Sequence, residues 1–101
     1  MQEFTARVLG IIKTIPKGQV MTYGQVASWA GNSRAARQVS RFLTTYSKSH
    51  ELPWHRVINS QGKISLQPGK GFEKQQGLLL AEGVEFGVGN RIDLTVYGRQ
   101  S

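Results

Sequence analysis

The chain has 101 residues, and its 13 lysines and arginines against 6 acidic residues give a formal net charge of +7 at pH 7. This length allows one domain with one main hydrophobic core. The absence of cysteine excludes disulfide scaffolds, thiolate zinc sites and cysteine nucleophiles. With no signal-peptide pattern and only short apolar runs, we expect a soluble, intracellular protein that does not bind a membrane. The positive charge favours a polyanionic partner, of which nucleic acid is the commonest.

The first third of the chain predicts two helices. Apolar residues recur at helical spacing over 4–15, and the pattern stops before Pro16. Thr22 is followed three residues later by Gln25, which is the pattern of a capping box. This box begins a second, short helix, which ends at Gly31.

A third helix is expected from about residue 34 to residue 46, with Asn32 or Ser33 as its cap. One of its faces is apolar, and the opposite face is cationic. The turn that joins the second and third helices is typical of a helix-turn-helix, whose second helix binds DNA. Ala35 and Ala36 are small enough to let this helix approach the wall of a groove. The exposed polar residues assigned to DNA binding are Arg34, Arg37, Gln38 and Arg41.

Two short apolar segments predict the β structure. Residues 56–58 and 63–65 flank the turn 59–62, and this arrangement favours a β-hairpin, or wing. After a glycine-rich turn, a fourth helix begins at about Phe72 and is closed by Gly83.

The tail has alternating apolar residues over 92–97, which predict a strand or an extended segment packed on the body. The sequence as a whole predicts a mainly α-helical fold with a small β-hairpin, that is, a winged helix-turn-helix. We expect a single domain over 1–101, with residues 86–101 as its C-terminal tail.

Several further residues are candidates for a functional site. Tyr23, at the start of the second helix, is either a core side chain or a ring presented to a ligand. Trp54, His55 and Arg56 could stack, hydrogen-bond and contact phosphate in succession, or could form the entry to a strand. Two histidines without cysteine make a poor metal site, and the glycine-rich turn 69–71 lacks the Ser/Thr that ends a phosphate-binding loop. We therefore expect no metal and no cofactor.

Five short motifs occur in one order: IPKGQV at 15–20, TYGQVA at 22–27, AARQV at 35–39, PWHRVI at 53–58 and LLAEG at 79–83. In that order they resemble the C-terminal DNA-binding domain of the O6-alkylguanine-DNA alkyltransferases, over about residues 4–86. In the enzymes a cysteine accepts the alkyl group, whereas this chain has Trp54 at that position. An indole is not a competent nucleophile for such a transfer. The chain therefore resembles the alkyltransferase-like proteins, which recognise the lesion without repairing it.

The resemblance also implies roles for individual residues. The third helix would enter the minor groove of duplex DNA, and Arg37 would fill the stack left by an extruded O6-alkylguanine. Tyr23 would help to rotate that nucleotide out of the duplex. His55 and Glu82, which activate the cysteine in the enzymes, would keep only a structural hydrogen bond. The lesion pocket would contain Tyr23, Trp54, Arg56 and Gln67.

The resemblance implies a monomeric, non-enzymatic sensor that binds O6-alkylguanine in duplex DNA. It would direct the lesion to nucleotide excision repair proteins and block an alkyltransferase by competition. In a bacterium it would be located in the cytoplasm, associated with the nucleoid. In any other host it would be located in the nucleus. Two alternatives stay open. One is a winged-helix regulator of undamaged DNA, and the other is an enzyme that uses His55 and Glu82 as acid and base, although no nucleophile or metal is evident.

Overall fold

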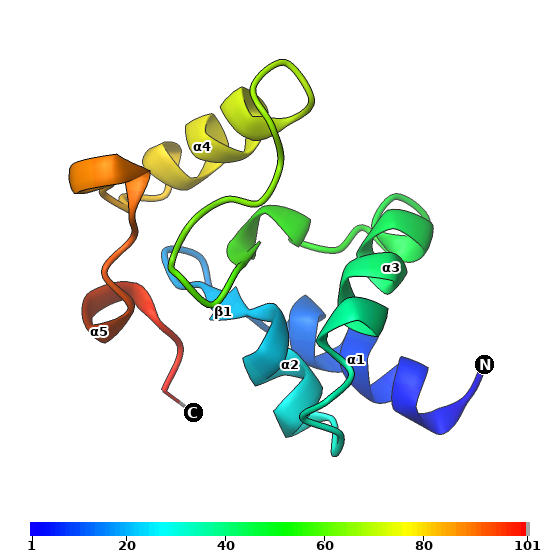
Figure 1. The fold of residues 1–101 in the computed structure, drawn as a ribbon. Helices are drawn as coiled ribbons and strands as arrows, with labels where there is room; N and C mark the ends of the chain where they lie inside the picture. Colours follow the sequence, from blue (N-terminus) through cyan, green and yellow to red (C-terminus); the bar gives the residue numbers. More distant parts are fainter. Residues whose placement is uncertain (101) are drawn as a thin grey trace.

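The protein is described by a computed structural model over residues 1–100, in which the first three helices pack together (Figure 1). Helix α1 (Glu3–Lys13) lies against α2 (Tyr23–Trp29) and α3 (Ala36–Tyr46). Their apolar faces share one hydrophobic cluster, because burying the apolar stripe of each helix is what stabilises a helix of this length. Its members without exposed surface include Val8, Ile12, Val26 and Val39.

A side-chain cap sets where the second helix begins, whereas the third helix follows a side-chain-stabilised turn and has no side-chain cap. Thr22 Oγ1 accepts a hydrogen bond from the Gln25 backbone N–H at 3.0 Å, which confirms the predicted cap of α2. The Gln25 side chain donates to the Arg99 carbonyl at 2.7 Å, so only half of the capping box forms. Asn32 Oδ1 accepts from the Arg34 N–H at 3.1 Å and holds the chain in a turn there. Helix α3 therefore begins two residues later than predicted, after Ala35, and the predicted cap at Asn32 or Ser33 is wrong.

The turn between α2 and α3 starts at Gly31, whose φ of +105° lies in the left-handed region that favours glycine. Helices α2 and α3 pack directly on one another through this turn. The predicted mainly helical, helix-turn-helix fold is confirmed, with a sheet of two short strands beside it.

The predicted β-hairpin is wrong in its pairing. Strand β2 (Val57–Ile58) pairs in parallel with β1 (Met21–Thr22), and residues 63–65 form no strand. The chain does reverse after β2, where the Asn59 N–H bonds to the Lys63 carbonyl at 3.0 Å. Both residues of β2 are buried, and a buried strand needs a partner inside the molecule, which β1 supplies. We call residues 59–65 the wing.

The C-terminal segment is helical where a strand or extended chain was predicted. It contains the turn η2 (Val88–Asn90) and the short helix α5 (Leu94–Tyr97). Asp93 caps α5, since its carboxylate accepts a hydrogen bond from the Thr95 N–H at 2.9 Å. The tail is attached to β1 by a backbone bond from the Val20 N–H to the Tyr97 carbonyl at 2.9 Å.

A second hydrophobic cluster joins helix α4 (Phe72–Ala81) to this tail. Leu79 is fully buried in it, whereas the next residue, Leu80, is 54% exposed. Within residues 1–100, no helix is long and apolar enough to cross a membrane. The other fully or nearly fully buried members of the cluster are Val20, Ile58, Val84 and Ile92.

We predict that Gly62→Ala lowers the free energy of unfolding by about 3 kcal/mol, because its φ is +81° and a Cβ would lie 2.7 Å from the Ile92 carbonyl oxygen. Gly69 is the matched control, since its φ of +78° is nearly the same but no atom lies within 4 Å of its Cβ position. Gly69→Ala should lower the free energy of unfolding by only about 1 kcal/mol. Urea unfolding measures the free energy of unfolding of both variants. Equal losses in the two variants would contradict a close contact between Gly62 and the tail.

Candidate functional site

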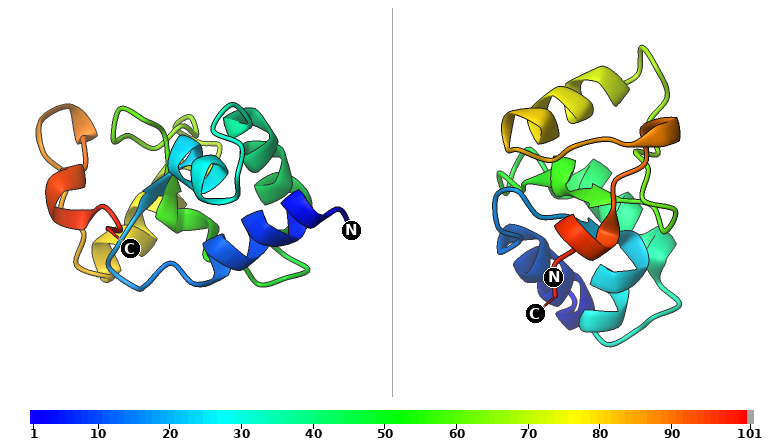
Figure 2. Two further views of the ribbon diagram at one scale, coloured as in Figure 1. Left: turned by 90° about the horizontal axis from the view of Figure 1, so that it is seen from below. Right: turned by 90° about the vertical axis from the view of Figure 1, so that its left-hand side faces the viewer.

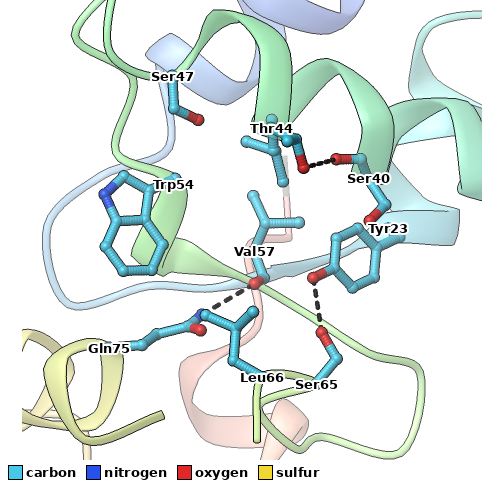
Figure 3. A pocket seen from close by; sticks show the side chains of 10 residues that line it. Tyr23, Ser40, Thr44, Ser47, Trp54, Val57, Ser65, Leu66 and Gln75 are labelled. Atoms are coloured by element: carbon cyan, nitrogen blue, oxygen red, sulfur yellow. Dashed lines mark hydrogen bonds between the residues drawn. The ribbon is translucent and has the colours of Figure 1, made fainter. Parts of the chain in front are cut away.

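An open pocket of about 270 Å³ lies where α3, the start of α2, the wing and the 3-10 turn η1 (Trp54–Arg56) come together. In Figure 3, Trp54 and Tyr23 lie on opposite sides of the pocket with Val57 between them. The two aromatic side chains provide flat apolar surfaces on which a planar base could stack. Helix α3 closes one side of the pocket with Ser40, Leu43, Thr44 and Ser47, and Ser65, Leu66 and Gln75 close the other.

Tyr23 is held in the pocket wall by the wing. Its hydroxyl lies 2.8 Å from Ser65 Oγ. The residue is the first of α2, so the cap that begins this helix also sets the direction of the ring. The half-buried ring packs against the first hydrophobic cluster and also lines the pocket, so both predicted interpretations of Tyr23 stay open.

Trp54 stands at the first position of η1 and is half-buried. Its backbone N–H donates to the Leu52 carbonyl at 2.8 Å. Its indole contacts the His55 ring edge-on, at a centroid distance of 6.0 Å. The indole therefore occupies a defined place in the wall of the pocket.

Behind the pocket, the Glu82 carboxylate binds three donors from distant parts of the chain. Arg56 donates to it twice, from Nη2 to Oε2 at 2.7 Å and from Nε to Oε1 at 3.0 Å. His55 Nε2 lies 2.7 Å from Oε2, and the Gly18 N–H donates to Oε1 at 3.1 Å. The Glu82 side chain is only 9% exposed. We call this arrangement the Glu82 hub.

The hub sets the charge state of its carboxylate. The hydrogen bonds from Arg56 lower the pKa of Glu82 to about 2, against the opposing effect of burial, and the bonds from His55 and Gly18 add to the lowering. Glu82 is therefore ionised throughout the physiological range. It is a fixed anion that orients the two side chains of η1.

Two residues predicted for the lesion pocket lie outside its lining. Arg56 points into the hub, and its Nη1 donates to the Ile15 carbonyl at 2.9 Å. Gln67 is exposed in the loop before α4, where its carbonyl accepts from the Lys70 N–H at 2.9 Å. Leu66 and Ser65 line the pocket in its place. Tyr23 and Trp54 are the two predicted pocket residues that the structure brings together there.

The predicted DNA-binding face of α3 is divided between surface and core. Ala35 is 6% exposed and packs in the first hydrophobic cluster, so its methyl group supports the helix from inside. Ala36 is half-buried at the first turn of α3. The polar residues assigned to DNA are all exposed: Arg34, Arg37, Gln38 and Arg41.

Several pocket residues were not found from the sequence. Gln75 is 3% exposed, and its Nε2 donates at 3.1 Å to the carbonyls of both His55 and Val57. No local pattern marks a buried amide in the middle of a helix. The hydroxyl wall of α3 had a weak signal, because its members recur at helical spacing beside the cationic face: Ser40, Thr44 and Ser47.

The part of the chain that the structure describes contains no group of three or more His, Asp or Glu side chains that could hold a metal ion. What the site can do chemically is to stack a flat ring, offer hydroxyl and amide groups to its edge, and surround its entrance with positive charge.

Comparison with known proteins identifies relatives of this arrangement. The family described as 6-O-methylguanine DNA methyltransferase, DNA binding domain, matches residues 3–84. A "DNA base-flipping protein" of Vibrio parahaemolyticus is 43% identical over 97 residues, which cover 96% of each chain. A protein of the same name from Escherichia coli is 48% identical over 94 residues, covering 93% of this chain and 72% of the relative. Alkyltransferase-like protein 1 of Schizosaccharomyces pombe is 41% identical over 86 residues, covering 84% of this chain and 80% of the relative.

Solved structures give the same grouping. The crystal structure of S. pombe Atl1 in complex with damaged DNA containing O6-carboxymethylguanine matches with a TM-score of 0.88 and 35% identity, over 100% of this chain and 98% of that one. The O6-methylguanine methyltransferase of Mycobacterium tuberculosis matches with a TM-score of 0.64 and 29% identity, over 96% of this chain but only 56% of its own.

We predict that the Glu82 hub makes stability depend on acid pH. Because the pKa of Glu82 falls from its ordinary 4.5 to about 2 on folding, its contribution is complete above about pH 5 and is lost as the pH falls toward 2. The contribution is about 3 kcal/mol. Glu82→Gln also leaves the Arg56 charge unpaired, so at pH 7 it should lower the free energy of unfolding by about 3–5 kcal/mol.

Chemical unfolding between pH 7 and pH 2 measures this effect, with Glu85→Gln as a control that changes the net charge equally. The difference in the free energy of unfolding between wild type and Glu82→Gln should become smaller as the pH falls. A difference independent of pH would show that the ionised hub is not what stabilises the site.

Ser47 provides a second prediction. Its Oγ is buried without a hydrogen-bond partner among the described residues, and such a group carries a desolvation cost of about 1–3 kcal/mol. Ser47→Ala should therefore leave the free energy of unfolding unchanged or raise it by up to about 1 kcal/mol. Thr44→Ala, which removes a bond from Oγ1 to the Ser40 carbonyl, is the comparison that should not stabilise. Urea unfolding decides, and a clear loss in Ser47→Ala would reveal a partner for its hydroxyl.

Proposed function

This chain belongs to the family of the 6-O-methylguanine DNA methyltransferase DNA-binding domain, and we propose that it is a non-enzymatic sensor of O6-alkylguanine in duplex DNA. One observation carries the proposal: a base-sized pocket beside an exposed cationic helix has Trp54 where the enzymes of the resemblance place their cysteine. The relative Atl1, crystallised with DNA that contains O6-carboxymethylguanine, supports this class of ligand.

The geometry supports extrusion of the damaged nucleotide. Helix α3 would lie in the minor groove, which is where proteins that kink and open duplexes commonly bind. Arg37, exposed on that helix, has a planar guanidinium that can stack between bases and hydrogen-bond to the orphaned partner base. The extruded base would then enter between Tyr23 and Trp54. Its exposed edge would meet the hydroxyl groups of α3.

The absence of a thiol supports the non-enzymatic part of the proposal. Transfer to the protein needs a nucleophile within reach of the alkyl carbon, and the chain has no cysteine. His55 keeps the hydrogen bond to Glu82 that a relay requires, but the chain has no thiol for it to activate. A bound lesion would therefore be held reversibly and would leave the protein unchanged.

Reversible binding implies a later step by other proteins. We extend the proposal to delivery of the bound lesion to nucleotide excision repair, and to competition with an alkyltransferase for the same lesions. The protein would act as a monomer, at the nucleoid in the cytoplasm of a bacterium or in the nucleus of a eukaryote. A pocket that need not align an alkyl carbon with a nucleophile can accept O6 substituents of several sizes.

The test is binding to one duplex that carries O6-methylguanine and to its guanine twin, at equal near-physiological salt. We expect tighter binding to the lesion and an unchanged protein mass in the recovered sample. Arg37→Ala should reduce the preference for the lesion by about tenfold or more, because the extruded state loses the side chain that fills the stack. Tyr23→Phe, which removes the bond to Ser65 but keeps the ring, should cause a smaller loss.

Arg34→Ala is the matched control, since Arg34 is an exposed arginine beside the same helix. It should weaken binding to both duplexes equally. Equal affinity of the wild-type protein for the two duplexes would instead indicate a regulator of undamaged DNA, and a gain in protein mass would indicate an enzyme.

A further inference from the structure

Two basic residues interlock the wing and the C-terminal tail. Arg91 of the tail packs on the wing, with its Cγ 3.3 Å from the position of a Cβ at Gly62. Lys63 of the wing reaches back, with its Nζ 3.9 Å from the Cβ position at Gly89. A backbone bond from the Ile92 N–H to the Gly62 carbonyl at 2.8 Å fixes the two segments together. Each cation thus lies over a glycine of the other segment, and we call this the wing–tail junction.

The junction carries charge that the protein itself does not neutralise. Over residues 1–100, neither Lys63 nor Arg91 has a carboxylate within ion-pair distance. An adjoining hollow of about 420 Å³ has one acid in its lining, Asp93. The carboxylate of Asp93 accepts hydrogen bonds from the N–H and the hydroxyl of Thr95, at 2.9 and 2.6 Å, and forms no ion pair with Arg91, although its negative charge offsets part of the local positive charge. Two basic side chains that form no ion pair within the described residues are available to an anionic partner.

The junction shares a face with the proposed recognition helix. In both views of Figure 2, η2, the wing and the turn that leads into α3 lie along one edge of the molecule. The segment that follows α1, over residues 14–20, lies toward the opposite edge. The turn that leads into α3, which contains the exposed Arg34, therefore lies on the same side of the molecule as the wing–tail junction, and Ser65 of the wing also lines the pocket. A partner that covers α3 and the pocket can extend over the junction.

We propose that Lys63 and Arg91 bind backbone phosphates of the duplex beside the lesion, and so form a second anchoring site for DNA. This inference rests on the proposed function, since the pocket sets where the duplex lies. The molecule is 38 Å long, which equals about 11 base pairs of B-form DNA. Because Ser65 of the wing lines the pocket, a duplex whose damaged nucleotide enters the pocket must pass close to the wing. Lysine and arginine donate strong, charge-assisted hydrogen bonds to phosphate oxygens, without regard to base sequence.

The second anchor would help to keep the duplex in register while one nucleotide is out of the stack. Phosphate contacts position a protein on DNA, and contacts with bases provide the specificity. The junction should consequently contribute equally to binding of damaged and undamaged duplexes. Discrimination stays with Arg37, Tyr23 and the pocket.

The test compares the double variant Lys63→Gln/Arg91→Gln with a matched control, Lys13→Gln/Lys17→Gln, which removes two exposed lysines from the opposite edge. Binding to the O6-methylguanine duplex and to its guanine twin is measured between 50 and 200 mM salt. Each lost phosphate contact reduces affinity by roughly fivefold at 0.15 M salt, and each lowers the slope of log affinity against log salt by about 0.9. In the junction variant we expect a lower affinity and a lower salt slope, to the same extent for the two duplexes. In the control variant we expect neither change.

A wild-type slope in the junction variant, or a loss no larger than in the control, would overturn the proposal. So would a selective loss of binding to the lesion, which would place these residues in lesion recognition. Lys63→Arg/Arg91→Lys, which keeps both charges, should restore affinity and slope, and so separates loss of charge from loss of folding. If the wild type shows no preference for the lesion while the junction variant still loses its slope, the proposed function fails and the second DNA anchor stands.

Discussion

The structure depends on one buried carboxylate. Glu82, at the end of α4, receives hydrogen bonds from the turn after α1, through Gly18, and from η1, through His55 and Arg56. These segments are separated by dozens of positions in the sequence. Apolar contacts are non-directional and would not by themselves fix one arrangement of the three segments. A buried anion that has all its hydrogen bonds can do so, because every displacement leaves charge unpaired in a poorly solvated place. Because His55 and Arg56 follow Trp54 directly in η1, the hydrogen bonds of the hub also hold this part of the pocket wall in place.

The regular sheet contributes little to that rigidity, since β1 and β2 have only two residues each. Side chains take over the role of a longer ladder. Gln75 donates to two carbonyls of the η1–β2 segment, and Arg56 donates to the carbonyl of Ile15, two residues after the end of α1. Position 54 projects from this framework without being part of it. A tryptophan can therefore occupy this position while the hub remains intact.

Predictions from the sequence succeeded where the signal was local. The Thr22 cap, the Gly31 turn and the apolar face of α3 each depend on residues within one helix turn, and all agree with the structure. The hairpin failed because a turn signal cannot reveal that Val57 and Ile58 find their partner over thirty residues earlier. The same limit hides which alanine of a pair faces inward and which hydroxyls meet an indole. The two aromatic pocket residues were found because resemblance supplied long-range information that periodicity lacks.

The tail shows how a structural requirement can create a binding surface. The family match ends at residue 84, yet Ile92 is buried in the second hydrophobic cluster, and the tail extends the hydrogen bonding of β1. To reach these places the chain must cross the wing closely, and the contact between Gly62 and Ile92 leaves no room for a Cβ. The long side chains at the crossing cannot enter the core, so the charged ends of Lys63 and Arg91 stay near the surface, where Lys63 is half-buried and Arg91 exposed. Packing of the tail thereby adds positive charge next to the wing, and the proposed phosphate contacts would need no additional element of structure.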